Sequence, residues 1–322
     1  MLLCVFGIAS AARPPIECSI KNDTIFGPND RKITQCEFKE VTYIGDKKLE
    51  FSLNDTTKYG FLDLRVKFVE SHIQSIPSNL FDQFSRLEIL EVNHVGLRNI
   101  FQNSFKSARF LKSLQAFGNR ISIVHAYSFV GAETLENLDL SNNIITNIHH
   151  ESFSGLENLK ELSLSSNWLS IIDEHTFQPL KNLSWIWLDR NQIKIISVNL
   201  LVSSQKLRGI YLNNNKVSAL STVLFDNLPE LEFLFLEGNN CTNKNFINTR
   251  ISTNSNVKKE LSKCFEEFRN VVPDEEEKFR LKHVLIGAEK ANKKCEEDKA
   301  ALLKRLEETS QKLTNLQQKN GK

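Results

Sequence analysis

The chain has 322 residues, which is room for two or more domains, and its 41 Lys and Arg residues nearly balance its 39 Asp and Glu residues. A formal net charge of +2 gives no support for a nucleic-acid-binding protein, which carries a basic stripe. No apolar stretch after the first dozen residues is long enough to cross a bilayer, so we expect no membrane span.

The chain starts with MLLCVFGIASAARPP, a short apolar run followed by small residues before Arg13. This pattern is typical of a secretory signal peptide with its cleavage site, and we assign residues 1–12 to it. The alternatives are an apolar N-terminal tail and a truncated start.

Four Asn-x-Ser/Thr triplets also favour export, because such triplets are glycosylated in secreted proteins. The triplet at Asn240 is doubtful if its middle residue, Cys241, is oxidised. We predict glycans on the other three asparagines, Asn22, Asn54 and Asn182. The protein is therefore expected to be secreted and extracellular.

A 24-residue repeat fills the middle of the chain. The pattern Leu-x-x-Leu-x-Leu, or a close apolar variant, begins at positions 87, 111, 135, 159, 183, 207 and 231. A weaker first copy begins at position 63, and the register is unbroken across all eight copies. Three positions after the sixth residue, six copies carry asparagine: Asn119, Asn143, Asn167, Asn191, Asn215 and Asn239. The nineteenth position holds Phe81, Phe105, Phe129, Phe153, Phe177, Leu201 and Phe225.

These columns resemble the leucine-rich repeat from about residue 63 to residue 241. The resemblance implies an α/β solenoid, a horseshoe of about eight 24-residue repeats with a parallel sheet on its concave face. The leucines pack inward, because one repeat cannot bury its apolar face alone and stacking supplies the core. The asparagine side chains bond the backbone where the chain turns out of the strand. The aromatic column fills the convex side.

The repeat boundaries divide the rest of the chain. We assign residues 13–62 to an N-terminal cap that forms a hairpin over the open edge, and residues 63–240 to the repeats. Residues 241–272 form a C-terminal cap with a helix at 257–268. Residues 273–322 form a helical coiled-coil tail.

The cysteines lie near the ends of the repeat array, as expected for disulfides that stabilise the two ends of an elongated protein. Cys4 belongs to the predicted signal, and the other five are Cys18, Cys36, Cys241, Cys264 and Cys295. We predict the disulfides Cys18–Cys36 and Cys241–Cys264, each contributing roughly 2–4 kcal/mol of stability. The alternative is reduced, buried cysteine, which is uncommon in exported proteins.

Two of the three tryptophans flank a core position in the sixth repeat, LSWIWL. Alternate side chains of a strand face opposite ways, so burial of Ile186 places Trp185 and Trp187 on the concave surface. The same outward positions continue in the last two repeats with Tyr211, Phe233 and Phe235.

Gly209 interrupts this aromatic surface, and we expect a gap of roughly two strand spacings between Trp185 and Phe233. Asp189 and Arg190 form a polar rim beside it. Three interpretations are open: cross-strand pairing, cover by the C-terminal segment, and a partner-binding site. We favour the partner site, because Trp, Tyr and Arg dominate interface hot spots and large exposed apolar patches mark contact surfaces.

No catalytic motif of the GxSxG, HExxH, P-loop or GxGxxG type occurs, so we expect neither an enzyme nor a cofactor. His125 and His149 occupy equivalent positions in adjacent repeats, with Asp173 in the next. A solvated column is favoured there over a metal site. Asp139 and Glu161 are concave carboxylates in a polar setting that does not suit acid–base catalysis.

From Pro273 onward the composition shifts to Glu, Lys, Ala and Leu in a heptad pattern. Lys299 and Thr309 weaken its seam, which comprises Leu281, Leu285, Asn292, Leu302, Leu306, Leu313 and Leu316. A polar residue such as Asn292 at a core position favours two strands. Cys295 also falls on the seam, so we predict an interchain disulfide. The alternatives are a lone helix with a free thiol and a helix docked on its own chain.

The signal sequence, the repeats, a C-cap of the form LEGNNC…F…C and a coiled coil with a spare cysteine together resemble the secreted leucine-rich immune proteins of mosquitoes. That resemblance implies a non-enzymatic scaffold in haemolymph, in which two chains join through coiled coils and an interchain disulfide and bind a complement-like thioester protein. Longer members have more cysteines after the repeats, whereas here only Cys295 follows the cap. The competing interpretation is an extracellular adhesion or growth-regulating protein that binds a receptor through its concave face.

Overall fold

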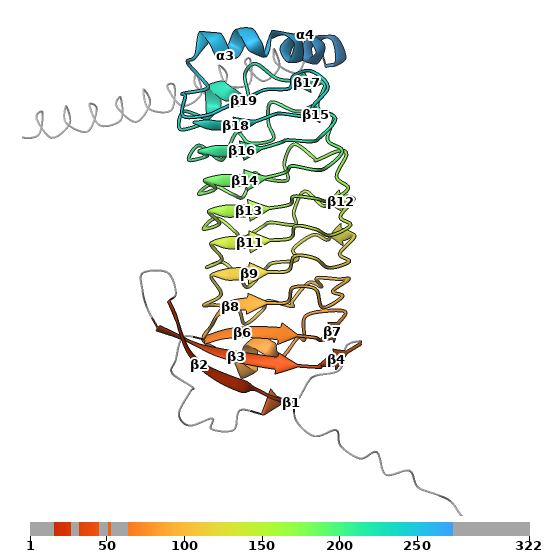
Figure 1. Cartoon of the computed structure of the whole chain (residues 1–322), viewed down its shortest axis with the longest axis vertical. Coiled ribbons are helices and arrows are strands. Elements are labelled where there is room, and N and C mark those ends of the chain that lie inside the picture. Colours follow the sequence, from red (N-terminus) through yellow and green to blue (C-terminus); the bar gives the residue numbers. More distant parts are fainter. Residues whose placement is uncertain (1–15, 27–31, 45–50, 53–63, 273–322) are drawn as a thin grey trace, which may run out of the picture. The chain divides into compact units, whose positions relative to one another are not determined.

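The computed structural model describes residues 16–26, 32–44, 51–52 and 64–272 (Figure 1). The chain divides into two units, Met1–Val271 and Val272–Lys322, and the elements coloured in Figure 1 belong to the first. The predicted signal peptide, the Asn54 triplet and the coiled-coil tail with Cys295 lie outside the described residues. No helix within the described ranges has the length and apolar character needed to cross a membrane.

Successive coils of the chain each add one strand to a single eleven-stranded sheet (Figure 1). Neighbouring strands are parallel from β3 to β18, whereas β2 and β19 are antiparallel to their neighbours at the two edges. In sheet order the strands are β2 Ser19–Phe26, β3 Lys32–Lys39, β6 Leu64–Val69, β8 Leu87–Glu91, β9 Ser113–Gln115, β11 Asn137–Asp139, β13 Glu161–Ser163, β14 Trp185–Trp187, β16 Gly209–Tyr211, β18 Phe233–Phe235 and β19 Asn245–Phe246.

The repeat register is regular apart from one local irregularity in the first copy. Leu114, Leu138 and Leu162 lie opposite one another on neighbouring strands, as the 24-residue period predicts. Between β6 and β8 the 24-residue register also holds, with Val66 opposite Leu90, and a local irregularity lies just before it, between Leu64 and Arg65. The solenoid makes about seven turns, against the roughly eight repeats predicted from the sequence.

The inward positions of the strands form a continuous apolar core, in which Leu162, Ile186 and Ile210 are all buried. Farther along each coil, the predicted aromatic column stacks ring on ring, with successive centroids 5.5, 5.6, 5.9 and 6.0 Å apart for Phe81, Phe105, Phe129, Phe153 and Phe177. Burial of each ring contributes about 1.5–3 kcal/mol, and each ring pair adds about 0.5–1.5 kcal/mol. The column therefore holds consecutive coils together.

The asparagine column ties each coil to its neighbour. Asn143 donates from Nδ2 to the carbonyls of Leu140 and Ala116, both at 3.0 Å, and the second of these lies in the preceding coil. Its Oδ1 accepts the N–H of Ile121 at 3.0 Å. The same pattern recurs at Asn119, Asn167, Asn191, Asn215 and Asn239. The structure therefore confirms the predicted role of this column.

The N-terminal segment forms the predicted hairpin of β2 and β3, and the disulfide Cys18–Cys36 joins residues with Cα atoms 5.5 Å apart. β3 also pairs in parallel with β6, and β4 (Thr42–Tyr43) pairs with β7 (His72–Ile73). The first coil of the solenoid thus lies inside the segment that we predicted as a cap. Its strand lacks the Leu-x-x-Leu-x-Leu pattern, which is why the repeat alignment did not include it.

Short elements occupy the other sides of the coils. Three further parallel pairs are formed by β1 (Ile16–Glu17) with β5 (Phe51–Ser52), β10 (Ile123–Val124) with β12 (Asn147–Ile148), and β15 (Ile195–Ile196) with β17 (Ala219–Leu220). The helical turns are α2 (Leu80–Gln83) and the 3₁₀ helix η1 (Phe225–Asn227).

The last coil is closed by side chains that take the place of the backbone carbonyls of a next coil, which accept the equivalent N–H groups of Leu212 and Asn214 in the coil before. Asn243 Oδ1 accepts the N–H of Gly238 at 2.7 Å. Asn245 Oδ1 accepts the N–H groups of Leu236 and Glu237, each at 3.0 Å. Backbone donors at the end of the sheet are therefore satisfied within the chain.

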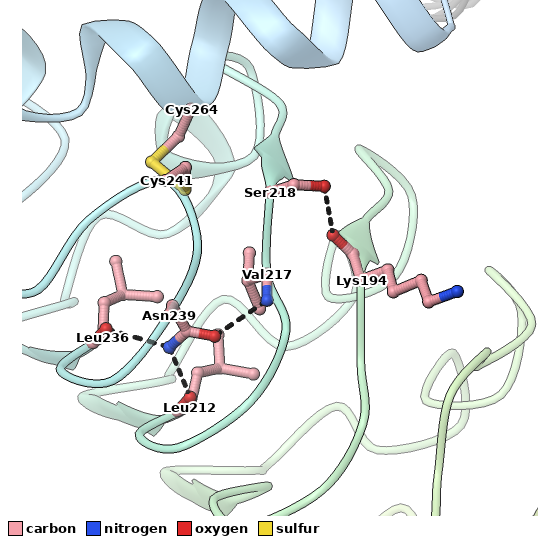
Figure 2. The surroundings of a disulfide bond; sticks show 8 residues. All are labelled: Lys194, Leu212, Val217, Ser218, Leu236, Asn239, Cys241 and Cys264. Carbon is pink, nitrogen blue, oxygen red and sulfur yellow. Dashed lines mark hydrogen bonds between the residues drawn. A yellow bond between two sulfur atoms is a disulfide. The ribbon is translucent and has the colours of Figure 1, made fainter.

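The predicted helix at residues 257–268 is two helices, α3 (Ser255–Glu260) and α4 (Ser262–Val271). Asn254 begins α3 by accepting the N–H groups of Asn256 and Val257, as an N-cap does. On α4, Cys264 is bonded to Cys241, with Cα atoms 5.0 Å apart. Figure 2 shows this disulfide next to the last member of the asparagine column.

Candidate binding face

Five aromatic side chains share the outward face of β14, β16 and β18. The inward residues of these strands are buried, whereas the aromatic residues are half-buried, so the predicted alternation around Ile186 is confirmed. Trp187 stacks on Tyr211 with centroids 5.5 Å apart, and Tyr211 stacks on Phe235 at 4.4 Å. We call Trp185, Trp187, Tyr211, Phe233 and Phe235 the aromatic patch.

The predicted gap at Gly209 does not exist. The indole of Trp185 leans across Gly209, and its ring centroid lies 5.4 Å from that of Phe233 and 6.3 Å from that of Tyr211. A Cβ atom on Gly209 would come within 2.2 Å of two ring carbons of Trp185. The expectation assumed a ring that stands upright over its own strand, whereas the missing side chain leaves room for the ring to lie down. Gly209 therefore makes the aromatic patch continuous.

Next to the patch, the same sheet face is hollowed over β9, β11, β13 and β14, with a volume of about 760 Å³. Trp187 belongs to both the patch and this hollow. The charged residues of its lining are Asp139, Glu161, Asp189 and Arg190. Serine and asparagine side chains supply most of the remaining lining, so the hollow is polar and carries more negative than positive charge. We call it the acidic hollow.

Hydrogen bonds orient two of these carboxylates. Asp139 Oδ1 accepts the N–H of Ser141 at 2.9 Å, and Asp189 Oδ1 accepts the hydroxyl of Ser165 at 2.5 Å. Burial and then the negative charge of Asp189 raise the pKa of Tyr211. Its phenol therefore remains a neutral hydrogen-bond donor throughout the physiological pH range.

Acidic residues at the other end of the sheet have cationic partners. Glu91 on β8 is buried and pairs with Arg65 and, at 3.7 Å, with Lys67. Burial lowers the pKa of Arg65, which nevertheless stays charged. By contrast, no ion pair within the described ranges involves a carboxylate of the acidic hollow. The described basic residues therefore form no ion pair with the carboxylates of the acidic hollow.

Among the described residues, the group that could hold a metal ion differs from the predicted column of His125, His149 and Asp173. His149 lies with His150 and Glu151, whose potential ligand atoms are all within 4.8 Å of one another, whereas His125 and Asp173 are not part of this group. His149 Nδ1 accepts the N–H of Glu151 at 3.2 Å, which engages a lone pair that a metal would need. The sequence signal for the group is the adjacent triplet His-His-Glu, whereas the predicted column rested on residues one repeat apart.

The side-chain amide of Asn182, a predicted glycosylation site, forms two hydrogen bonds. Its Nδ2 donates to the carbonyl of Glu157 at 2.7 Å, and its Oδ1 accepts from Lys206 Nζ at 2.6 Å. A glycan is attached at Nδ2, so its addition would alter the first of these bonds. The side chain of Asn22 lies outside the described residues.

Comparison with known proteins identifies the fold. A leucine rich repeat family matches residues 133–193 and 187–240, and the BspA type leucine rich repeat region (6 copies) matches residues 17–123. These matches extend over nearly all the coils of the sheet. The chain is a leucine-rich repeat protein. Leucine-rich repeat proteins of this fold are interaction scaffolds and not enzymes.

The chain is similar to a chain in a crystal structure of a TLR13–ssRNA13 complex, with a TM-score of 0.53 and 28% sequence identity. The similarity covers 55% of this leucine-rich repeat protein and 25% of that chain, so it spans about a quarter of the neighbour's length. A comparison with curated proteins found no match.

Proposed function

We propose that this leucine-rich repeat protein is a secreted scaffold of innate immunity that binds a partner protein through the aromatic patch. The observation that carries the proposal is the continuous stack of five aromatic side chains on the outward face of β14, β16 and β18. Aromatic residues concentrated in this way dominate the affinity of protein interfaces.

The repeat fold itself does not require these aromatic residues. Its core is made by the inward positions and the asparagine column, and the outward positions are free to vary. In the third to fifth repeats the outward positions of the strands are polar: Ser113, Gln115, Asn137, Asp139, Glu161 and Ser163. Stacking of outward rings contributes about 0.2–1 kcal/mol per cross-strand pair, which is little beside the core. A binding role accounts for their concentration better than fold stability does.

Several features support the secreted and immune parts of the proposal. Two disulfides, Cys18–Cys36 and Cys241–Cys264, fit an oxidising extracellular compartment. The Asn-x-Ser/Thr triplets and the apolar start of the chain point the same way. The resemblance to secreted mosquito immune proteins suggests that the tail, residues 273–322, joins two chains and that a complement-like effector is the partner.

The test is affinity capture from the native extracellular fluid with the full chain and with Trp187→Ala/Phe235→Ala. We expect the wild-type protein to retain a defined partner and the double variant to lose most of it, because the two substitutions remove both ends of the longest stacked row. Trp168→Ala/Phe101→Ala is the matched control, since Trp168 and Phe101 are 57% and 46% exposed but lie outside the patch. Equal capture by wild type and patch variant, at equal folded content, would contradict the proposal.

A further inference from the structure

The charge around the aromatic patch restricts what kind of segment can dock on it. Glu161 lies opposite Trp185 on the neighbouring strand, and Ser163 lies opposite Trp187. Asp189 follows Trp187 by two residues along the same strand direction, and both line the acidic hollow. Negative side chains therefore border the patch on the side of the hollow.

Aromatic rings and carboxylates select for the same type of ligand. The face of an indole ring carries negative electrostatic potential and attracts a guanidinium or an ammonium group, most strongly when water is excluded. A carboxylate next to such a ring adds a charge-assisted hydrogen bond to the same cation. Trp187, at the junction of patch and hollow, offers both interactions to one side chain.

The hollow also lacks an internal cation sufficient to neutralise it. Arg190 is the one basic residue of its lining, against the carboxylates of Asp139, Glu161 and Asp189. Elsewhere on the sheet, Glu91 is neutralised by Arg65 and Lys67. Like charges gathered around one hollow repel, and a cationic ligand relieves that repulsion when it binds.

We propose that the partner segment that docks on the aromatic patch is cationic and extends arginine or lysine side chains over Trp187 into the acidic hollow. This inference rests on the proposed function and specifies the chemistry of the partner. Arginine suits the site better than lysine, because its planar guanidinium both stacks on a ring and forms paired hydrogen bonds with a carboxylate. A polyanion such as single-stranded RNA is repelled by the same carboxylates.

The test uses defined, dye-labelled probes on the full chain: Arg-Gly and Glu-Gly repeat peptides of equal length, and an oligouridine. Fluorescence anisotropy at low salt is expected to show saturable binding of the Arg-Gly peptide, at least about tenfold tighter than that of the other two probes. High salt should weaken this binding, because the charged groups are partly exposed to solvent. Tighter binding of the Glu-Gly peptide or the oligouridine, or no binding of the Arg-Gly peptide, would overturn the inference.

Asp139→Asn/Glu161→Gln/Asp189→Asn removes the charges but keeps the oxygen acceptors of the two oriented carboxylates. We expect this triple variant to bind the Arg-Gly peptide about tenfold more weakly. The control Glu133→Gln/Glu157→Gln/Glu230→Gln has the same net charge, and its substituted residues are exposed and lie outside the hollow, so its affinity should match that of wild type. Equal affinities of the two triple variants would exclude the hollow as the cation site.

Capture of the natural partner separates this inference from the proposed function. If Trp187→Ala/Phe235→Ala abolishes capture while the hollow triple variant retains it fully, the binding role of the patch stands and the cationic partner is wrong. If neither variant affects capture, both proposals fail.

Discussion

Gly209→Ala tests whether the absence of a side chain at this position allows the Trp185 indole to lie across the sheet. The new Cβ would lie 2.2 Å from two ring carbons, whereas ordinary contact begins at 3.4 Å, so the ring must move by about 1 Å or more. Displacement weakens the contact between Trp185 and Phe233, which is worth about 0.5–1.5 kcal/mol.

A second effect of Gly209→Ala acts in the opposite direction. Gly209 lies in β16 without a positive φ, so alanine fits its backbone and restricts the unfolded chain, a gain of about 0.4–1 kcal/mol. The two effects nearly offset each other, and we expect the free energy of unfolding to change by less than about 1 kcal/mol. The tryptophan emission and near-ultraviolet circular dichroism should nevertheless change, because they report on ring packing.

A double-mutant cycle separates the two effects. Urea unfolding of Trp185→Ala and Trp185→Ala/Gly209→Ala should show a net stabilisation of about 0.4–1 kcal/mol from the glycine substitution, since no indole remains to be displaced. If Gly209→Ala had the same effect on stability with and without Trp185, the ring would not depend on the glycine. The explanation for the continuous patch would then be wrong.

Two further predictions concern the scaffold and the tail. Asn167→Ala leaves the N–H of Ile145 without its partner, whereas the carbonyls of Leu140 and Leu164 keep the Nδ2 donors of Asn143 and Asn191, so we expect a loss of about 1–3 kcal/mol in urea unfolding. Asn137→Ala, on the outward side of β11, should cost less than about 0.5 kcal/mol, and similar losses for both variants would show that the asparagine column has no special role. Cys295→Ser should convert a covalent dimer to a monomer on a non-reducing gel. A wild-type protein that migrates as a monomer without reductant would remove the interchain disulfide from the proposal.

Much of the fold can be predicted from the sequence because the same residue pattern recurs in each repeat. Ile186, Ile210 and Leu234 recur at one position, so their burial and the opposite exposure of their neighbours are set by strand alternation. The asparagine column follows equally directly, since an amide at a turn both donates and accepts. Periodicity was the physical basis of these predictions.

The features that the sequence did not reveal depend on three-dimensional context. The Trp185 ring can lie where it does because Gly209, on the neighbouring strand, has no side chain to occupy that space. The first coil, with β3, has the pairing of a repeat without its leucine spacing. The division of α3 from α4 at Leu261 also interrupts a continuous helical pattern. None of these is encoded by residue spacing within one repeat.

The asparagines that follow the last coil have a consequence for how copies of this protein can associate. Asn243 and Asn245 accept the N–H groups of the three residues that follow β18, and the edge strand β19 has only two residues. A short edge strand is a poor template for the strand of another molecule. Growth of filaments by end-to-end joining of sheets is thus suppressed at this end, and self-association there must use side-chain surfaces instead of backbone pairing.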